Sequence, residues 1–120
     1  MELSHEAAEH FAKAWTQAWN SRDIEAILSH YADEVSFSSP FVVKAYGRES
    51  GTLNGKGELR AYFLTALELF PDLHFTDATF FLGISGIVLT YRGVWDLRAA
   101  EYMQLNDASQ AVVVRCHYHE

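Results

Sequence analysis

Apolar side chains recur every three or four residues in two long stretches of the chain, which predicts two amphipathic helices. The first helix is expected from about residue 4 to residue 20. The second begins near Gly55 and ends before Pro71, because proline cannot continue a helix and restricts the residue that precedes it. Its aromatic-rich face needs a sheet to pack against, and consists of Leu59, Tyr62, Phe63, Ala66, Leu67 and Phe70.

A shorter helix is predicted between these two. Residues 20–23 break the first pattern, and Asp23 is suited to cap the helix that follows. Two helices so closely joined should pack as a hairpin. Residues 33–34 are expected to end the hairpin, and 35–38 alternate as a half-buried strand that Pro40 interrupts. The expected apolar stripe of the short helix is Ile24, Ile27, Leu28 and Tyr31.

The remainder of the chain is mostly strand-like. Strands are expected at about 73–82, 86–94, 99–105 and 110–119, with turns at 83–86, 95–97 and 106–109. Residues 41–53 are interpreted as an irregular connection with room for one short strand. Helices followed by consecutive antiparallel strands predict an α+β domain with the helices on one face. A curved sheet covered in this way encloses a pocket.

Length and composition indicate one folded domain spanning residues 1–120. A chain of 120 residues buries roughly two-thirds of its unfolded surface, and 49% hydrophobic residues exclude disorder. No apolar run is long enough to span a bilayer, and the first ten residues lack the features of a secretion signal. The single cysteine, Cys116, excludes an internal disulfide. We therefore expect a cytoplasmic protein.

Charge and motifs narrow the partners. The formal net charge is −7 and the basic residues form no cluster, so neither nucleic acid nor a membrane is an expected partner. The glycines at 47–57 lack the context of a phosphate loop, and the chain contains neither a Rossmann fingerprint nor a G-x-S-x-G motif. The expected ligand is a small molecule of little charge, with no cofactor.

A pattern of particular residues extends over nearly the whole chain. It comprises Trp15, Trp19, Asn20, Asp23, Tyr31-Ala32-Asp33-Glu34-Val35, Ser39-Pro40, Gly51-Thr52, Gly55-Lys56, Leu59-Arg60, Tyr62-Phe63 and Phe70-Pro71-Asp72-Leu73. In this order the elements and residues resemble the nuclear transport factor 2-like superfamily, and most closely its small bacterial SnoaL-like proteins. The resemblance implies a cone-shaped, curved, mixed or antiparallel sheet, three helices covering its concave face, and a homodimer.

This scaffold carries isomerases, dehydratases, epoxide hydrolases, polyketide cyclases and non-catalytic binders, so activity must be argued residue by residue. In the ketosteroid isomerase branch, the resemblance implies a tyrosine donor, a base aspartate and a protonated acid where this chain has Trp15, Ser39 and Glu101. A serine without an activating partner cannot replace a carboxylate base, which disfavours steroid isomerisation. The epoxide hydrolases need an arginine flanked by acids, and Ala99 breaks that pattern.

Glu101 is the leading candidate for chemistry. If Met103 and Leu105 face the concave side, strand alternation places Glu101 there too. Removal from water would raise the pKa of its carboxyl group and allow it to act as a donor or general acid near neutral pH. The alternative is a carboxylate at the pocket rim, or one paired with Arg92 or Arg98.

Several other side chains are candidates for polar contacts with a ligand. The indole N–H of Trp15 would donate to a carbonyl group or to Tyr31, although a core position is the alternative. Tyr31 and Tyr62 each carry a hydroxyl group that needs a partner when buried. The predicted ligand-binding set is Trp15, Tyr31, Ser39, Tyr62, Met103, Val114, Cys116 and Tyr118.

The last strand is expected to divide into two faces. Val112, Val114, Cys116 and Tyr118 would face the pocket, with Cys116 as a small apolar lining residue. The outer face would carry Val113, Arg115, His117 and His119. Two histidines do not complete a metal site, so no metal is predicted.

The sequence thus predicts a homodimeric α+β protein that binds a small, mostly apolar organic molecule. If it is an enzyme, Glu101 would be the acid or base of a cofactor-independent isomerisation, dehydration or cyclisation. The alternative is a non-catalytic binding or interaction domain. A buried, hydrogen-bonded Glu101 favours the first hypothesis, and a solvated or ion-paired one favours the second.

Overall fold

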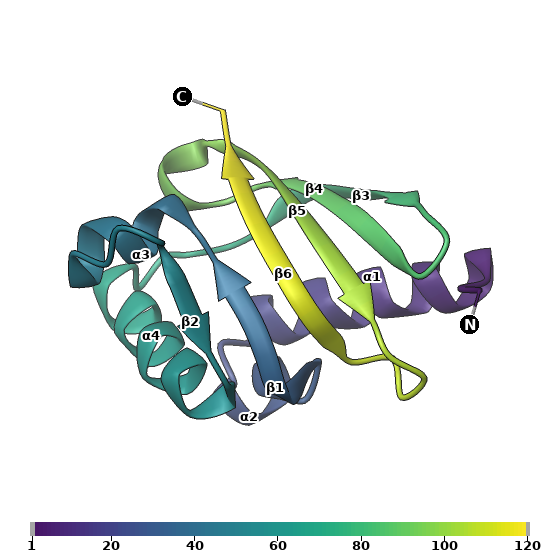
Figure 1. Cartoon of the computed structure of the whole chain (residues 1–120). Coiled ribbons are helices and arrows are strands. Elements are labelled where there is room, and N and C mark those ends of the chain that lie inside the picture. The colour runs from purple at the N-terminus through teal and green to yellow at the C-terminus, as the bar shows by residue number, and fades with distance from the viewer. Residues whose placement is uncertain (1, 120) are drawn as a thin grey trace.

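The computed structural model describes residues 2–119 and shows helices followed by a long antiparallel meander (Figure 1). In chain order the elements are α1 (His5–Ser21), α2 (Ile24–Leu28), β1 (Tyr31–Ser38), α3 (Pro40–Tyr46), β2 (Thr52–Asn54), α4 (Lys56–Leu69), β3 (Thr76–Leu82), β4 (Gly86–Arg92), the 3₁₀ turn η1 (Val94–Asp96), β5 (Arg98–Leu105) and β6 (Ala111–Tyr118). Over this part of the chain, no helix has the length and hydropathy to cross a membrane.

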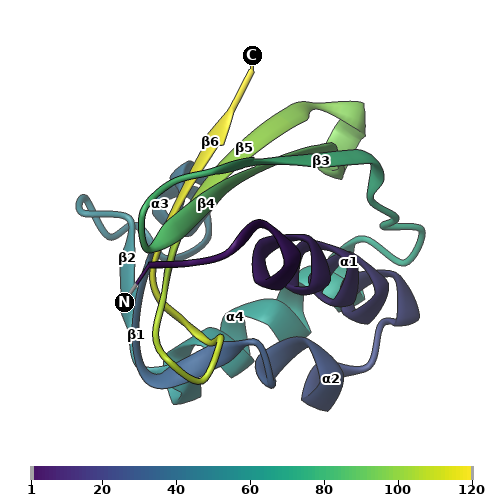
Figure 2. The same cartoon turned by 90° about the vertical axis from the view of Figure 1, so that its right-hand side faces the viewer.

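One six-stranded sheet in the order β2-β1-β6-β5-β4-β3 forms the framework. All neighbouring strands are antiparallel except β1 and β6, which run parallel, so the sheet is mixed. Figure 2 shows the sheet curving around α1, α2 and α4, which cover its concave side. The predicted α+β cone with three covering helices is confirmed, and α3 is an additional helix near the end of the sheet formed by β1 and β2.

The chain enters β1 earlier than expected. Tyr31 was predicted on the stripe of the second helix, but it is the first residue of β1 and pairs with Ala111 of β6. Asp33 and Glu34, expected to end the hairpin, lie within this strand. The helix prediction failed here because α2 ends after Leu28, where long-range pairing with β6 replaces the local helical pattern.

Residues 40–46 form the helix α3, which corrects the expectation of an irregular connection. The Ser39 hydroxyl accepts a hydrogen bond from the Phe41 N–H at 3.2 Å, and Pro40 occupies the first turn, where its missing N–H costs nothing. Val42 is fully buried and ties the helix to the core. The Ser39-Pro40 pair, which was predicted only to interrupt a strand, therefore also begins a helix.

Two side chains at the end of α1 hold the segment between α4 and β3. The Asn20 side chain donates to the Phe75 carbonyl oxygen at 3.0 Å and accepts from the Phe75 N–H at 2.8 Å. The Arg22 guanidinium donates to the carbonyl oxygens of Leu67 at 2.5 Å and Phe70 at 3.2 Å. These bonds satisfy carbonyl groups at the end of α4. The strand predicted from residue 73 consequently begins only at Thr76.

Gly86 and Gly57 differ in how much room the surrounding structure leaves for a side chain. A Cβ atom at Gly86 would lie 2.4 Å from the Met103 carbonyl oxygen of the neighbouring strand, whereas one at Gly57 in α4 would meet nothing within 4 Å. We expect Gly86→Ala to lower the free energy of unfolding by about 1–3 kcal/mol, because backbone must move. Gly57→Ala should raise it by about 0.4–1 kcal/mol, because alanine restricts the unfolded chain. Urea denaturation of both variants measures this, and changes of the same sign would contradict it.

Candidate functional site

A cavity of about 320 Å³ lies between the concave face of the sheet and the helices α3 and α4. The lining residues Leu69 and Trp95 are 67% and 66% exposed and show where the cavity opens to solvent. The Trp95 ring packs edge-on against Phe41 and Phe70, each at a centroid distance of 5.7 Å. Most of the wall is aromatic, and its aromatic residues are Trp19, Tyr31, Phe37, Phe41, Tyr62, Phe63, Phe70, Phe75, Tyr91, Trp95 and Tyr118.

The carboxyl group of Glu101 lies in this wall and is the one carboxyl group among the lining residues of the described chain. Its residue is only 4% exposed and stands between Leu89 of β4 and Cys116 of β6. The Tyr91 hydroxyl donates a hydrogen bond to one carboxyl oxygen, and the Cys116 Sγ lies 3.3 Å from the other. Arg92 instead pairs with acidic residues outside the cavity, so the alternative of an Arg92 ion pair does not hold.

Burial controls the ionisation of this group. Loss of water raises the pKa of Glu101 above its ordinary value, and the hydrogen bonds from Tyr91 and Cys116 lower that pKa only in part. Burial also raises the pKa of Tyr91 and of the Cys116 thiol. The thiol therefore keeps its proton and is no nucleophile. Burial therefore favours the neutral carboxylic acid of Glu101, and the donors Tyr91 and Cys116 partly stabilise its carboxylate form.

A second group of hydroxyls lies nearer α3 and α4. Tyr62 and Tyr118 line the cavity, and burial raises the pKa of both phenols, while hydrogen bonding with the Ser39 side chain lowers it in part. Both phenols are therefore neutral donors at physiological pH. Ser39 is buried, caps α3 and lies outside the cavity lining, where it acts on the lining tyrosines. Its predicted contact with a ligand stays a prediction.

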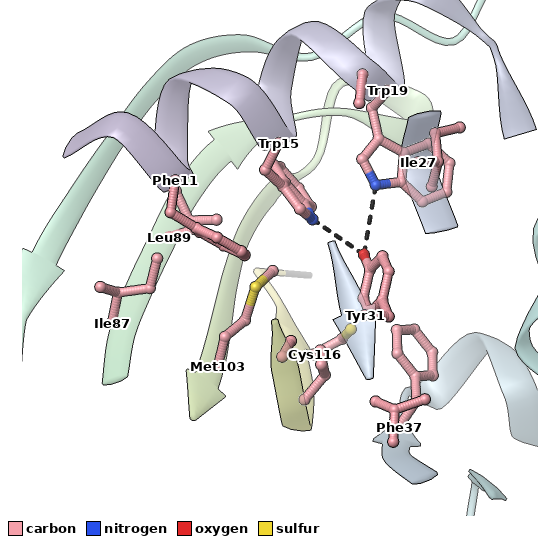
Figure 3. Close-up of a cluster of buried hydrophobic side chains, with 14 of the residues drawn as sticks. Phe11, Trp15, Trp19, Ile27, Tyr31, Phe37, Ile87, Leu89, Met103 and Cys116 are labelled. Atoms are coloured by element: carbon pink, nitrogen blue, oxygen red, sulfur yellow. Dashed lines mark hydrogen bonds between the residues drawn. The ribbon is translucent and has the colours of Figure 1, made fainter. Parts of the chain in front are cut away.

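Tyr31 is held by both tryptophans of α1. The indole Nε1 of Trp15 donates to the Tyr31 hydroxyl oxygen at 2.9 Å, and that of Trp19 at 3.5 Å (Figure 3). Tyr31 is 1% exposed and lines the cavity. Of the two sequence alternatives for Trp15, a carbonyl group or Tyr31, the structure shows Tyr31 as its partner.

Three predicted ligand contacts belong to the packed core and do not line the cavity. Trp15 stacks on Phe75 at a centroid distance of 5.4 Å, and Met103 and Val114 are paired across β5 and β6 with no exposed surface. Figure 3 shows Trp15 and Met103 packed among other apolar side chains. They lie outside the cavity lining because α1 covers this part of the sheet, and their contact with a ligand stays a prediction.

The alternation predicted for the last strand holds only from Val114 onward. Leu105 pairs with Ala111 but Gln104 pairs with Val113, so Val112 is an extra residue in a bulge. Ala111 is buried where Val112 was expected to be. Cys116 and Tyr118 lie beyond the bulge and line the cavity as predicted.

Sequence reasoning missed Tyr91, the hydrogen-bond donor to Glu101. The signal was present, because Ile87, Leu89 and Tyr91 alternate along β4 and all three are buried on its concave face. Phe41 and Trp95 were also missed, since neither α3 nor the turn η1 was expected to approach the pocket. Within residues 2–119, no three or more His, Cys, Asp or Glu residues are grouped to hold a metal ion.

Comparison with known proteins identifies this arrangement. The sequence profile of the SnoaL-like domain matches residues 12–116. The chain belongs to the SnoaL-like domain family. A SnoaL-like protein of unknown function from Burkholderia thailandensis is 36% identical over 100% of both chains, with a TM-score of 0.95. The resemblance noted in the sequence is thus confirmed, and a search of the curated proteins found no match.

More distant solved structures share the fold of this SnoaL-like protein. A protein from Kribbella flavida, provisionally named a ketosteroid isomerase, is 15% identical over 96% of this chain and 79% of its own, with a TM-score of 0.73. TerC, co-crystallized with polyporic acid, is 19% identical over 94% of this chain and 92% of its own, also with a TM-score of 0.73. At these identities the likeness concerns the fold alone.

Proposed function

We propose that this SnoaL-like protein binds a small, mostly apolar organic molecule in its cavity and exchanges protons with it through Glu101, without a cofactor. One observation carries the proposal: an isolated carboxyl group, 4% exposed and held by two neutral donors, faces a largely aromatic cavity. A carboxyl group with a raised pKa is suited to give and take protons near neutral pH. Isomerisation, dehydration and cyclisation are the reaction types this supports.

A single carboxyl group is sufficient for such chemistry. In a dehydration, the carboxylic acid of Glu101 donates its proton to a hydroxyl group, and water leaves with the electrons of the broken C–O bond. The resulting carboxylate then removes a proton from the neighbouring carbon, which forms the double bond and restores the acid. In an isomerisation, the carboxylate removes a proton from one carbon and returns it to another. Tyr91 supports both forms by remaining hydrogen-bonded to the carboxyl group.

Two structural neighbours carry names that bear on this proposal. The Kribbella protein is provisionally named a ketosteroid isomerase, and TerC was co-crystallized with polyporic acid. The resemblance implies that Ser39 stands where ketosteroid isomerases have their base aspartate, and in this chain Ser39 is buried and caps α3. We therefore propose proton transfer on a substrate other than a steroid, with Glu101 alone in the role of acid and base.

Deuterium exchange tests the proposal. The protein is incubated in D₂O with 2-tetralone, an aromatic ketone with acidic C–H bonds next to its carbonyl group, and incorporation is followed by mass spectrometry. We expect exchange faster than in buffer alone. Ala66→Trp should abolish the acceleration, because Ala66 lines the cavity on α4. Ala61→Trp is the matched control, since Ala61 is exposed on the same helix outside the cavity lining, and it should retain the wild-type rate.

The same experiment separates the two hypotheses about function. Binding of 2-tetralone that Ala66→Trp blocks, with exchange no faster than in buffer, would favour the non-catalytic binder. One observation favours the non-catalytic hypothesis: both oxygens of Glu101 already contact protein donors, Tyr91 and Cys116. Equal exchange by the wild type and Ala66→Trp would contradict a reaction inside the cavity.

Self-association through the outer face of the sheet remains a prediction. Phe81 and Tyr102 lie in one cross-strand row with Val88 on this face, and they are 64% and 39% exposed. Large apolar residues exposed together often mark an interaction surface. A second copy of the chain is the partner implied by the resemblance.

A further inference from the structure

The hydroxyl of Tyr31 occupies an unusual position within the cavity wall. Its oxygen accepts two hydrogen bonds, one from the indole of Trp15 at 2.9 Å and one from the indole of Trp19 at 3.5 Å. An indole nitrogen donates and never accepts. Both bonds therefore use the lone pairs of the phenol oxygen, and neither can receive its hydrogen.

The hydrogen of this hydroxyl has no acceptor among the hydrogen bonds of residues 2–119. The carboxyl group of Glu101, which also lies in the cavity wall, already receives the Tyr91 hydroxyl on one oxygen and contacts Cys116 through the other. Tyr31 is 1% exposed, so bulk water does not reach it freely. A buried donor without an acceptor destabilises the structure, because it has lost its hydrogen bonds to water.

The direction of the free hydrogen follows from the two tryptophans. Trp15 and Trp19 both belong to α1 and approach the phenol oxygen from that helix (Figure 3). The remaining direction around the oxygen lies away from α1. Tyr31 also lines the cavity, and an acceptor atom placed there is the group that can complete its hydrogen bonding.

We propose that Tyr31 is a specificity-determining residue that donates a hydrogen bond to a carbonyl oxygen of the bound molecule, and that Trp15 and Trp19 are positioning residues that fix the direction of this donor. The inference rests on the proposed binding of a small organic molecule in the cavity and adds its chemical class, an aromatic or apolar carbonyl compound. A hydrocarbon offers no acceptor for the hydroxyl.

The charge state of the phenol agrees with a donor role. Burial raises the pKa of Tyr31 well above its usual range, and Glu101 raises it further, against smaller opposing effects of the two indoles. The hydroxyl is therefore protonated at any physiological pH. A carbonyl oxygen held by Tyr31 would also lie near Glu101, whose proton is the one to be exchanged.

A matched pair of naphthalenes tests this inference by binding alone. The probes are 2-acetylnaphthalene, which carries a carbonyl group, and 2-ethylnaphthalene, which has a similar shape without one. We expect Tyr31→Phe to weaken the binding of 2-acetylnaphthalene about three- to ten-fold, the effect of one neutral hydrogen bond, and to leave 2-ethylnaphthalene unchanged. The infrared C=O stretch of the bound ketone should move to higher wavenumber in Tyr31→Phe.

Two further variants separate direction from packing. Trp15→Phe keeps an aromatic ring but removes one indole donor, so the C=O stretch should move part of the way and broaden. Tyr102→Phe is the control, because its hydroxyl is lost from the outer face of the same sheet. It should change neither probe's binding nor the C=O stretch.

The outcomes distinguish this inference from the proposed function. Equal effects of Tyr31→Phe on both naphthalenes, or an unchanged C=O stretch, would overturn the carbonyl contact and leave proton exchange by Glu101 standing. A shifted C=O stretch together with absent deuterium exchange would support the contact and remove the catalytic role. If neither naphthalene bound the wild type, both the cavity's proposed ligand class and this inference would fall.

Discussion

Glu101→Gln is expected to slow the deuterium exchange of 2-tetralone by about 10²–10⁴-fold, the usual contribution of general acid–base catalysis. Glutamine has nearly the shape of glutamate, so its carbonyl oxygen still accepts the hydrogen bond from Tyr91, and its amide still contacts Cys116. What it loses is the ability to take and release a proton. Binding of 2-tetralone should therefore persist while turnover fails, which separate measurements of affinity and exchange rate reveal.

Stability against pH provides the control that this variant is folded. The pKa of Glu101 is raised in the folded protein, so the fold favours the protonated form. The contribution of this protonated carboxyl group to the stability of the fold is fully present below the ordinary pKa of 4.5. It is lost as pH rises through the raised pKa of the folded protein, because the buried group must then ionise. Glutamine does not ionise. The stability of Glu101→Gln relative to the wild type should therefore increase as pH rises above 4.5.

A folded Glu101→Gln variant that exchanges the deuterium of 2-tetralone at the wild-type rate would contradict the proposed role of Glu101 as acid and base.

Trp15→Ala is expected to lower the free energy of unfolding by about 3–5 kcal/mol, the largest stability change we predict. Trp15 is 1% exposed and packs against Phe75 and Tyr91, each at a centroid distance of 5.4 Å. Alanine would leave a large cavity between α1 and the sheet. It would also remove the shorter of the two hydrogen bonds to the Tyr31 hydroxyl. Urea denaturation followed by circular dichroism measures the loss.

Trp95→Ala is the matched control for this prediction. Trp95 is 66% exposed and lies at the cavity mouth, so its removal takes little apolar surface out of the core. We expect a change within about 1 kcal/mol. If both tryptophan variants lost the same stability, packing beneath α1 would not be the source of the effect, and the description of the core would be wrong.

Local patterns in the sequence were sufficient for much of the framework. The spacing of apolar residues in α1 and α4 and the break at Pro71 predicted both long helices, and the turns between the last strands were placed nearly as observed. The Asp23 side chain caps α2 as predicted, accepting from the Glu25 N–H at 3.0 Å. These features depend on neighbours a few residues away, which a single sequence displays directly.

Elements that depend on distant partners were predicted poorly. Tyr31 continues the apolar spacing of α2, yet pairing with Ala111 of β6 makes it the start of a strand. Ser39 and Pro40 were interpreted only as an interruption of the preceding strand, yet they begin α3. In both places the local signal was compatible with two structures, and contacts with remote segments selected between them.

The candidate site divides in the same way. Strand alternation alone indicated that Glu101 faces the concave side together with Cys116 and Tyr118, because side chains two residues apart share a face. Alternation does not state depth along the cone. Only the tertiary structure shows that Met103 and Val114 lie beneath α1 and do not line the cavity.

By itself, then, the sequence determined the periodic elements, the family and the position of the Glu101 carboxyl group on the concave side of the cone. The tertiary structure alone decided that Tyr91 donates a hydrogen bond to Glu101, that the indoles of Trp15 and Trp19 donate to Tyr31, and which aromatic rings enclose the cavity. The physical reason is that periodicity records which side of an element is apolar. Partnership between side chains depends on how the helices cross a curved sheet, and that is settled by packing across the whole chain.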